Sequence, residues 1–196
     1  MTHARPRVPQ AGDEAGEVEP HEPPHPPANA GQPQTPRRRC GRALVFYAIA
    51  AATWILDQST KWLAVKQVGY GSSATAVAGI VSITPVRNVN AAWNIPVPTV
   101  ALILVSTAVA GALFIYGTRA AAGTPALMVA LSLLLGGATG NLYDRLRWAA
   151  VVDFIDLHFW PTFNVADAAI TVGTLLIVVC VILHKPRREP RTPAHA

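Results

Sequence analysis

The stretch FNVADAAITVGTLLIVVCVILH (163–184) decides the fold, because it joins a long apolar run to a carboxylate at the start of that run. The apolar part, 166–184, is long enough to cross the hydrocarbon core of a bilayer as a helix. A carboxylate beside hydrocarbon is costly, and acids that persist there are commonly paired or functional. The stretch therefore predicts a transmembrane helix that keeps Asp167 near one membrane surface.

Three further apolar runs of similar length precede this one, at 43–64, 97–117 and 125–143. Hydrophobic residues make up 51% of the 196 residues, but they are concentrated in these runs. Continuous runs of this length indicate membrane spans rather than the helices of a soluble domain. The sequence therefore predicts an α-helical integral membrane protein with four transmembrane helices in a domain that spans 43–184.

The two ends of the chain are polar and basic. Residues 1–42 are rich in Pro, Ala, Gly and Glu and end in the basic cluster RRRCGR (37–42), and 185–196 form a basic C-terminal tail. The composition of the N-terminal segment predicts disorder. Residues 1–42 and 184–196 hold ten of the sixteen Lys and Arg residues, and the positive-inside rule then places both termini in the cytoplasm. The positive charge thus indicates membrane orientation, and no basic-aromatic groove pattern suggests a nucleic-acid partner.

Two segments are then expected on the outer side of the membrane. Residues 65–96 are rich in Val, Ile and Thr with partial alternation, which predicts a small extracytoplasmic β element. Residues 144–165 form the second outer segment. Four tryptophans fall near the expected outer boundary of the membrane, as an interfacial aromatic belt would require. They are Trp62, Trp93, Trp148 and Trp160.

Acidic residues are nearly excluded from the membrane domain. Between 43 and 183 there is no glutamate, and five aspartates remain, at positions 57, 144, 153, 156 and 167. Asp57 and Lys61 lie four residues apart in DQSTK (57–61), a spacing that favours a side-chain pair on one helix face. Two interpretations stay open for this pair: a structural ion pair, or a direct part of a functional site.

A glycine-rich stretch, GGATGNLYDR (136–145), ends the third apolar run. Gly136 and Gly140 are four residues apart, which favours close helix packing and leaves room for an extended peptide. Gly137 is grouped with them as a supporting residue. Asn141 offers an amide and Arg145 a guanidinium, and both are candidates for binding a substrate backbone. Asp144, beside Arg145, is interpreted as a member of an ion pair or a helix cap rather than as a catalyst.

Asp153 and Asp167 form the candidate catalytic pair. Asn164 and Asp167 match a capping box at the start of the fourth run, so a cap alone could explain Asp167. Asp153, in VVDFI (151–155), stands between apolar neighbours without a local partner. If the outer segment folds back, Asp153 meets Asp167, and two adjacent carboxylates share one proton. Such a pair can activate water with one oxygen and protonate a carbonyl with the other. Asp156 is the rival partner.

Neither a metal nor an organic cofactor is expected. The two cysteines, Cys40 and Cys180, and six scattered histidines show no metal-ligand spacing and no disulfide framework.

Five motifs in order make the chain resemble the lipoprotein signal peptidases (signal peptidase II), a family of bacterial membrane aspartyl proteases. The resemblance covers about 43–184 and rests on DQSTK (57–61), NVNAAW (88–93), GGATGNLYDR (136–145), VVDFI (151–155) and FNVAD (163–167). It implies that the catalytic aspartates are Asp153 and Asp167. It assigns supporting or substrate-binding roles to Asp57, Lys61, Asn88, Asn90, Gly137, Asn141, Arg145 and Asn164.

The resemblance also implies the reaction and the setting. The substrate would be the signal peptide of a diacylglyceryl-modified prolipoprotein, cut just before the lipidated cysteine without a cofactor. Further contacts would be with membrane lipid, and a monomer in the bacterial cytoplasmic membrane is expected, with the active site near the outer leaflet. In the second motif, Asn90 and Trp93 replace the usual glycine and phenylalanine, which affects the expected local fit of the substrate.

Two rival functions remain open from the sequence alone. A small transporter or channel component could use the aspartates as a proton relay. A non-enzymatic assembly factor would tolerate replacement of both Asp153 and Asp167.

Overall fold

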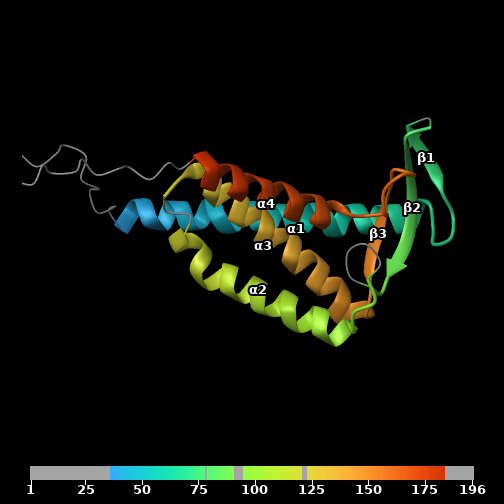
Figure 1. Ribbon diagram of the computed structural model, residues 1–196, viewed down its shortest axis with the longest axis horizontal. Coiled ribbons are helices and arrows are strands. Elements are labelled where there is room, and N and C mark those ends of the chain that lie inside the picture. Colours follow the sequence, from blue (N-terminus) through green and yellow to red (C-terminus); the bar gives the residue numbers. More distant parts are fainter. Residues whose placement is uncertain (1–35, 78, 91–94, 121–122, 184–196) are drawn as a thin grey trace, which may run out of the picture. The chain divides into compact units, whose positions relative to one another are not determined.

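The computed structural model describes residues 36–77, 79–90, 95–120 and 123–183 (Figure 1). The tails 1–35 and 184–196 lie outside the described residues, and so does Trp93. The expectations of a disordered N-terminal tail and of a role for Trp93 therefore concern parts of the chain that are not described.

Four long helices make up most of the described chain. They are α1 (Pro36–Gln67), α2 (Thr99–Ala120), α3 (Pro125–Trp148) and α4 (Val165–Leu183). In the part of the chain that the structure describes, these four helices are long and apolar enough to cross a membrane. The predicted fold of four transmembrane helices is confirmed.

Two helices extend beyond the predicted spans. α1 begins at Pro36, so the basic cluster 37–42, expected to end the tail, is helical. α3 continues to Trp148, five residues past the expected end at 143, and carries Asp144 and Arg145 in its last turns. An apolar run marks the part of a helix that suits hydrocarbon, whereas backbone hydrogen bonding continues into the polar ends.

α3 is the central helix, and it packs against α1, α2 and α4. A core cluster of buried side chains packs against it, formed by Phe46 and Ala50 of α1, Ala110 of α2, and Leu131 and Leu135 of α3 itself. Glycines allow the closest approaches. A Cβ atom on Gly136 would come within 2.6 Å of the carbonyl oxygen of Ala50, and one on Gly173 within 2.7 Å of that of Ala130. The small-residue pattern of α3 therefore serves helix packing.

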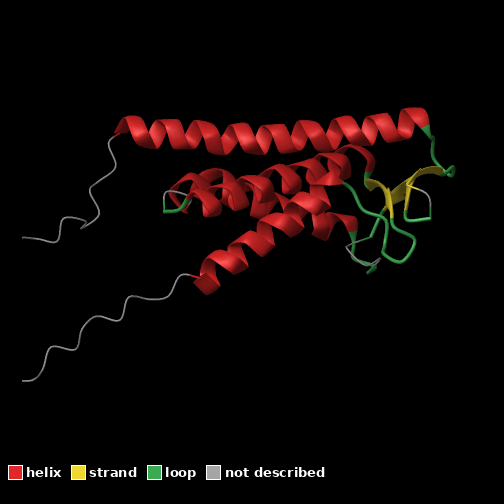
Figure 2. Cartoon of the chain, turned by 90° about the horizontal axis from the view of Figure 1, so that it is seen from above, coloured by secondary structure: helices red, strands yellow, loops and turns green. Residues whose placement is uncertain are grey.

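Three strands form an antiparallel sheet at one end of the helices, where Figure 2 shows them gathered. They are β1 (Ala74–Val77), β2 (Val81–Asn88) and β3 (Val151–Asp156), in the order β1-β2-β3. The β element expected within 65–96 is confirmed as the hairpin of β1 and β2. The third strand comes from the second outer segment and was not expected. VVDFID lacks polar alternation because all of its first four residues are buried.

The segment between β3 and α4 is a loop whose two ends lie side by side. Phe163 pairs with Ile155 in an isolated bridge, with hydrogen bonds of 2.8 Å from Ile155 N to Phe163 O and 3.1 Å from Phe163 N to Ile155 O. This bridge is termed the β3–α4 clasp. Because α4 begins two residues after Phe163, the clasp brings the start of α4 beside β3, and hence Asp167 near Asp153.

The contact at Gly137 gives a test of the packing. A Cβ on Gly137 would lie 2.6 Å from the carbonyl oxygen of Ala166 in α4, whereas one on Gly111 of α2 would meet no atom within 4 Å. We expect Gly137→Ala to destabilise the protein by about 1–3 kcal/mol through overpacking. Gly111→Ala should be neutral or stabilising, because alanine favours the helix by roughly 1 kcal/mol. Thermal unfolding of the two variants in detergent measures the difference. Equal melting temperatures would contradict the close packing of α3 on α4.

Candidate active site

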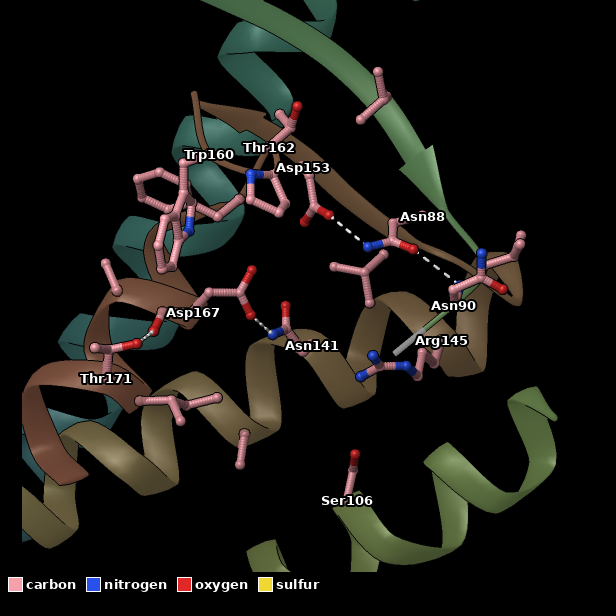
Figure 3. Close-up of a pocket in the computed structure, with 18 of the residues that line it drawn as sticks. Asn88, Asn90, Ser106, Asn141, Arg145, Asp153, Trp160, Thr162, Asp167 and Thr171 are labelled. Atoms are coloured by element: carbon pink, nitrogen blue, oxygen red, sulfur yellow. Dashed lines mark hydrogen bonds between the residues drawn. The ribbon is translucent and has the colours of Figure 1, made fainter. Parts of the chain in front are cut away.

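A cavity of about 990 Å³ lies at the sheet end of the helices, among α2, α3, α4, β2 and the segment after β3 (Figure 3). Much of its wall is apolar, with Val105 and Val109 from α2 and Ile170 from α4. Polar side chains are concentrated in one region of the wall, and Figure 3 shows them facing one another. Among them are Asn88, Asn141, Arg145, Asp153 and Asp167.

Asp153 projects from β3 and is held by two asparagines. Asn88 Nδ2 donates to Asp153 Oδ2 at 3.0 Å, and Asn164 Nδ2 donates to Asp153 Oδ1 at 2.7 Å. The backbone N–H of Asn90 donates to Asn88 Oδ1 at 2.9 Å. That bond fixes the Asn88 amide with its NH₂ group toward Asp153.

Asn90, which replaces the usual glycine of the second motif, is compatible with the hydrogen bonds around Asn88. The contribution of Asn90 to the Asn88 amide comes from its main chain, which is independent of the side chain. Among the described residues, the non-glycine positions with positive φ are Ala149 and His158, so the backbone at Asn90 does not need a glycine.

Asp167 lies in the first turn of α4. Asn141 Nδ2 donates to Asp167 Oδ1 at 2.7 Å, and the backbone N–H of Asn164 donates to Asp167 Oδ2 at 3.3 Å. In return, the Asp167 N–H donates to Asn164 Oδ1 at 2.9 Å. This reciprocal pair is the capping box that the sequence predicted, so Asp167 is both a helix cap and a wall residue of the cavity.

Asn164 connects the two carboxylates. It is fully buried, and its Nδ2 lies within hydrogen-bonding distance of Asp153 Oδ1, of Asn141 Oδ1 at 3.2 Å and of the Val152 carbonyl at 3.3 Å. Within the described residues, the hydrogen bonds of Asp153 and Asp167 go to asparagines rather than to each other. The structure thus brings both aspartates to one cavity through an asparagine bridge, and direct proton sharing between them stays a prediction.

The surroundings of Asp153 raise its pKa toward neutral pH. Burial raises the pKa of Asp153 to about 6, and repulsion from Asp167 acts in the same direction. The hydrogen bonds from Asn88 and Asn164 and the charge of Lys61 lower the pKa, but by less in sum. A carboxyl group with such a pKa can exchange a proton near neutral pH, as general acid–base catalysis requires.

Arg145 lies one helical turn beyond Asn141 on α3, and its guanidinium points toward the cavity (Figure 3). Its charge interacts favourably with the carboxylates of Asp167, Asp153 and Asp144. A cation in this position can bind substrate carbonyl oxygens and stabilise negative charge that develops at the reacting centre.

A buried ion triad supports the site from behind. Lys61 Nζ lies 2.8 Å from Asp57 Oδ2 and 2.8 Å from Asp144 Oδ2, and all three side chains are almost completely buried. The i,i+4 pair of Asp57 and Lys61 is therefore confirmed as an ion pair. Asp144 also pairs as expected for an ion-pair member, although its partner is Lys61 and not its neighbour Arg145.

The triad makes a hydrogen bond to each of α3, α4 and β3, the elements that carry Asn141, Asp167 and Asp153. Lys61 Nζ donates to Asn141 Oδ1 at 3.1 Å, which turns the Asn141 NH₂ group toward Asp167. Asp57 Oδ1 accepts the backbone N–H of Ala166 at 2.9 Å, in the first turn of α4. Asp144 Oδ2 accepts the backbone N–H of Val152 at 3.2 Å, next to Asp153.

Sequence reasoning missed one member of this network. Gln58 Nε2 donates to Asp57 Oδ2 at 3.0 Å, to Asp144 Oδ1 at 3.1 Å and to the Gly140 carbonyl at 3.3 Å. Its position beside Asp57 in DQSTK was the available signal. The rival acid is placed elsewhere: Asp156 accepts the His158 N–H at 2.8 Å and does not line the cavity.

The structure places Gly137 at the α3–α4 contact rather than in the cavity wall. Among the described residues there is no group of three or more His, Cys, Asp or Glu side chains that could hold a metal ion.

Comparison with known proteins gives one consistent family. Residues 49–183 match the family described as signal peptidase (SPase) II. The chain is 41% identical over 141 residues to the lipoprotein signal peptidase of Geobacillus kaustophilus, covering 69% of this chain and 92% of that protein. It is 36% identical over 151 residues to the lipoprotein signal peptidase of Bacillus subtilis, covering 74% of this chain and 98% of that protein.

The fold has a solved counterpart. A structure described as a bacterial membrane enzyme, determined by the in meso method at 2.3 Å resolution, aligns with a TM-score of 0.68 at 31% identity. The alignment covers 77% of this chain and 95% of that chain.

The raised pKa of Asp153 predicts a pH dependence of stability. On folding, the pKa rises from 3.8 to about 6, so between these values the folded protein holds a proton that the unfolded chain has released. The free energy of unfolding therefore falls as the pH rises through this window and is constant outside it with respect to this group. We expect Asp153→Asn to flatten the decrease in melting temperature between about pH 4 and pH 6. Identical slopes for the two proteins would contradict the assigned environment of Asp153.

The buried triad predicts a large effect at Lys61. Lys61→Met leaves two carboxylates buried without their cation, and we expect it to lower the free energy of unfolding by about 3–5 kcal/mol. The matched control is the triple variant Lys61→Met, Asp57→Asn, Asp144→Asn, which removes the charges together and should recover part of the loss. Denaturant unfolding in detergent gives both values. A triple variant no more stable than Lys61→Met would show that unpaired charge is not the cause.

Proposed function

The chain belongs to the signal peptidase II family of aspartic endopeptidases, and from this premise we propose that it removes the signal peptides of diacylglyceryl-modified prolipoproteins. Cleavage would occur just before the lipidated cysteine. The observation that supports the proposal most directly is that Asp153 and Asp167 line one cavity and are joined through Asn164. This is a pair of acids beside a mostly apolar cavity, as hydrolysis of a membrane-embedded peptide requires.

The proposed chemistry uses one proton on the pair of carboxyl groups. The ionised carboxylate takes a proton from a water molecule as the water oxygen attacks the scissile carbonyl carbon. The protonated carboxyl donates to the carbonyl oxygen, which gives a neutral tetrahedral intermediate. Its collapse breaks the C–N bond, and a proton passes to the nitrogen of the lipidated cysteine. The two groups titrate as a unit through this cycle, and the pKa of about 6 at Asp153 suits the exchange.

Substrate binding would use the rest of the cavity. The apolar wall formed by Val105, Val109 and Ile170 suits the side chains of a signal peptide and the acyl chains beside it. Arg145 and the asparagines would bind the substrate backbone and restrict its freedom, so that the scissile carbonyl faces the two aspartates.

The proposed setting is the bacterial cytoplasmic membrane with the sheet on the outer side. The described chain begins and ends at the end of the helices away from the sheet (Figure 1). The basic residues concentrated in 1–42 and 184–196 favour the cytoplasm for that end. The active site would then lie near the outer leaflet, where an exported prolipoprotein presents its cleavage site.

The rival proton relay is less favoured by the positions of the acids. A relay across a membrane requires ionisable groups distributed through its depth. Here Asp57, Asp144, Asp153 and Asp167 belong to one connected cluster at the sheet end. Ion flux through proteoliposomes, compared with lipopeptide cleavage by the same preparation, distinguishes the two functions.

Neutral substitutions test the catalytic pair. Asp153→Asn and Asp167→Asn should each lower kcat for a diacylated lipobox peptide by at least about 10²–10⁴-fold, because each removes a group that transfers a proton. Asp156→Asn is the matched control: it changes an acid of the same strand that does not line the cavity, and it should retain cleavage. Near-normal turnover by either of the first two variants would refute the dyad, provided that all three proteins are folded by circular dichroism.

A further inference from the structure

Five side chains at the sheet end of the helices stack in alternation, aromatic ring against guanidinium. Arg87 Cζ lies 4.9 Å from the centroid of the Tyr70 ring and 5.5 Å from that of the Trp148 ring. Arg147 Cζ lies 4.8 Å from the Trp148 centroid and 5.9 Å from that of Tyr143. We term these five residues the cation–aromatic ladder. They come from the loop after α1, from β2 and from the last turns of α3.

Among the described residues, no carboxylate neutralises the charges of the ladder. All five side chains are exposed. In the ranges that the structure describes, no carboxylate lies within ion-pair distance of Arg87 or Arg147; the ion pairs there involve Lys61 and His158. Arg147 does donate to the hydroxyl of Tyr143 at 2.8 Å, which orders its guanidinium without cancelling its charge.

The distribution of positive charge along the membrane domain also sets the two arginines of the ladder apart. Six Lys and Arg residues occur between 43 and 183, and Arg119 is the one that lies toward the end of the helices away from the sheet (Figure 1). The other five lie toward the sheet end, the reverse of the bias that the positive-inside rule describes for short flanking segments. Lys61 is neutralised by the triad and Arg145 faces the catalytic carboxylates. Lys66, whose Nζ lies 4.5 Å from the centroid of the Trp62 ring, and the two arginines of the ladder have no carboxylate partner among the described residues.

The chemistry of the ladder suits a phosphate group at a membrane surface. Stacking on an aromatic ring fixes the plane of a guanidinium and leaves its N–H edge for an acceptor. Two N–H groups in that edge match two phosphate oxygens. Tryptophan and tyrosine side chains favour the headgroup level of a bilayer, so Tyr70, Trp148 and Tyr143 would hold both arginines at the depth of lipid phosphates.

We propose that the cation–aromatic ladder binds the phosphate of an anionic glycerophospholipid of the surrounding leaflet, with Arg87 and Arg147 as donors. Arg87 also lines the wall of the catalytic cavity, so the bound lipid would lie at the rim of that cavity. The binding requires no peptide cleavage. It therefore goes beyond the proposed function, and its test does not depend on whether Asp153 and Asp167 are catalytic.

The test measures lipid binding to the purified full-length protein by native mass spectrometry. The protein in detergent is titrated with dioleoyl-phosphatidylglycerol and, separately, with dioleoyl-phosphatidylcholine. We expect the first phosphatidylglycerol to bind about tenfold more tightly than phosphatidylcholine, since interfacial basic residues attract anionic lipid. The double variant Arg87→Gln, Arg147→Gln should lose this preference and keep its affinity for phosphatidylcholine.

Two comparison variants sharpen the result. Arg119 also stacks on an aromatic ring, with its Cζ 5.9 Å from the Tyr116 centroid, but it lies at the other end of the helices. The variant Arg119→Gln should therefore retain the preference for phosphatidylglycerol. Arg87→Lys, Arg147→Lys keeps both charges and removes the planar fork, so it should retain only part of the preference.

Four outcomes would overturn the proposal. They are an undiminished preference in the glutamine double variant, an equal loss in Arg119→Gln, full retention in the lysine double variant, and displacement of the lipid by millimolar inorganic phosphate. The last of these would identify a general phosphate site rather than a lipid site. Melting temperatures measured beside the titrations confirm that each variant is folded.

Discussion

One buried ammonium group joins the elements that meet behind the cavity. Lys61 of α1 lies 2.8 Å from both Asp57 and Asp144, and none of the three side chains is appreciably exposed. Burying three charges is costly, and it is tolerated because the ammonium group lies between the two carboxylates and because both carboxylates also accept a backbone N–H group. Those N–H groups belong to Ala166 of α4 and Val152 of β3. The ion triad therefore contacts both segments that carry an aspartate of the proposed catalytic pair.

Three asparagines donate hydrogen bonds to the carboxylates of Asp153 and Asp167. Each amide is oriented by a bond to its oxygen: Asn88 by the Asn90 N–H, Asn141 by Lys61, and Asn164 by the Asp167 N–H. Their NH₂ groups then face Asp153 or Asp167. At Asp153 these amide donors favour the ionised carboxylate and lower its pKa, whereas burial raises it, so the two effects oppose each other.

The sequence was sufficient to predict the four spans and to predict that Asp153 and Asp167 lie at one site. It was insufficient to predict the hydrogen-bond network that joins them. Apolar runs locate transmembrane helices because the bilayer demands length and hydrophobicity together. The i,i+4 pair of Asp57 and Lys61 and the capping box of Asn164 and Asp167 are local, so spacing alone predicted them. The bond from Lys61 to Asn141 and the role of Gln58 join residues about 80 positions apart. β3 was missed because burial on both faces removes the alternation that marks a strand.

The β3–α4 clasp separates the positions of the two aspartates from the sequence of the loop that forms part of the cavity wall. Ile155 and Phe163 close the segment 157–162 at its base, so both ends of this loop are anchored close in sequence to Asp153 and Asp167. Phe159 and Trp160, however, belong to the cavity wall. Insertions, deletions or substitutions within this short loop can therefore remodel substrate preference during evolution while the machinery of hydrolysis is inherited unchanged.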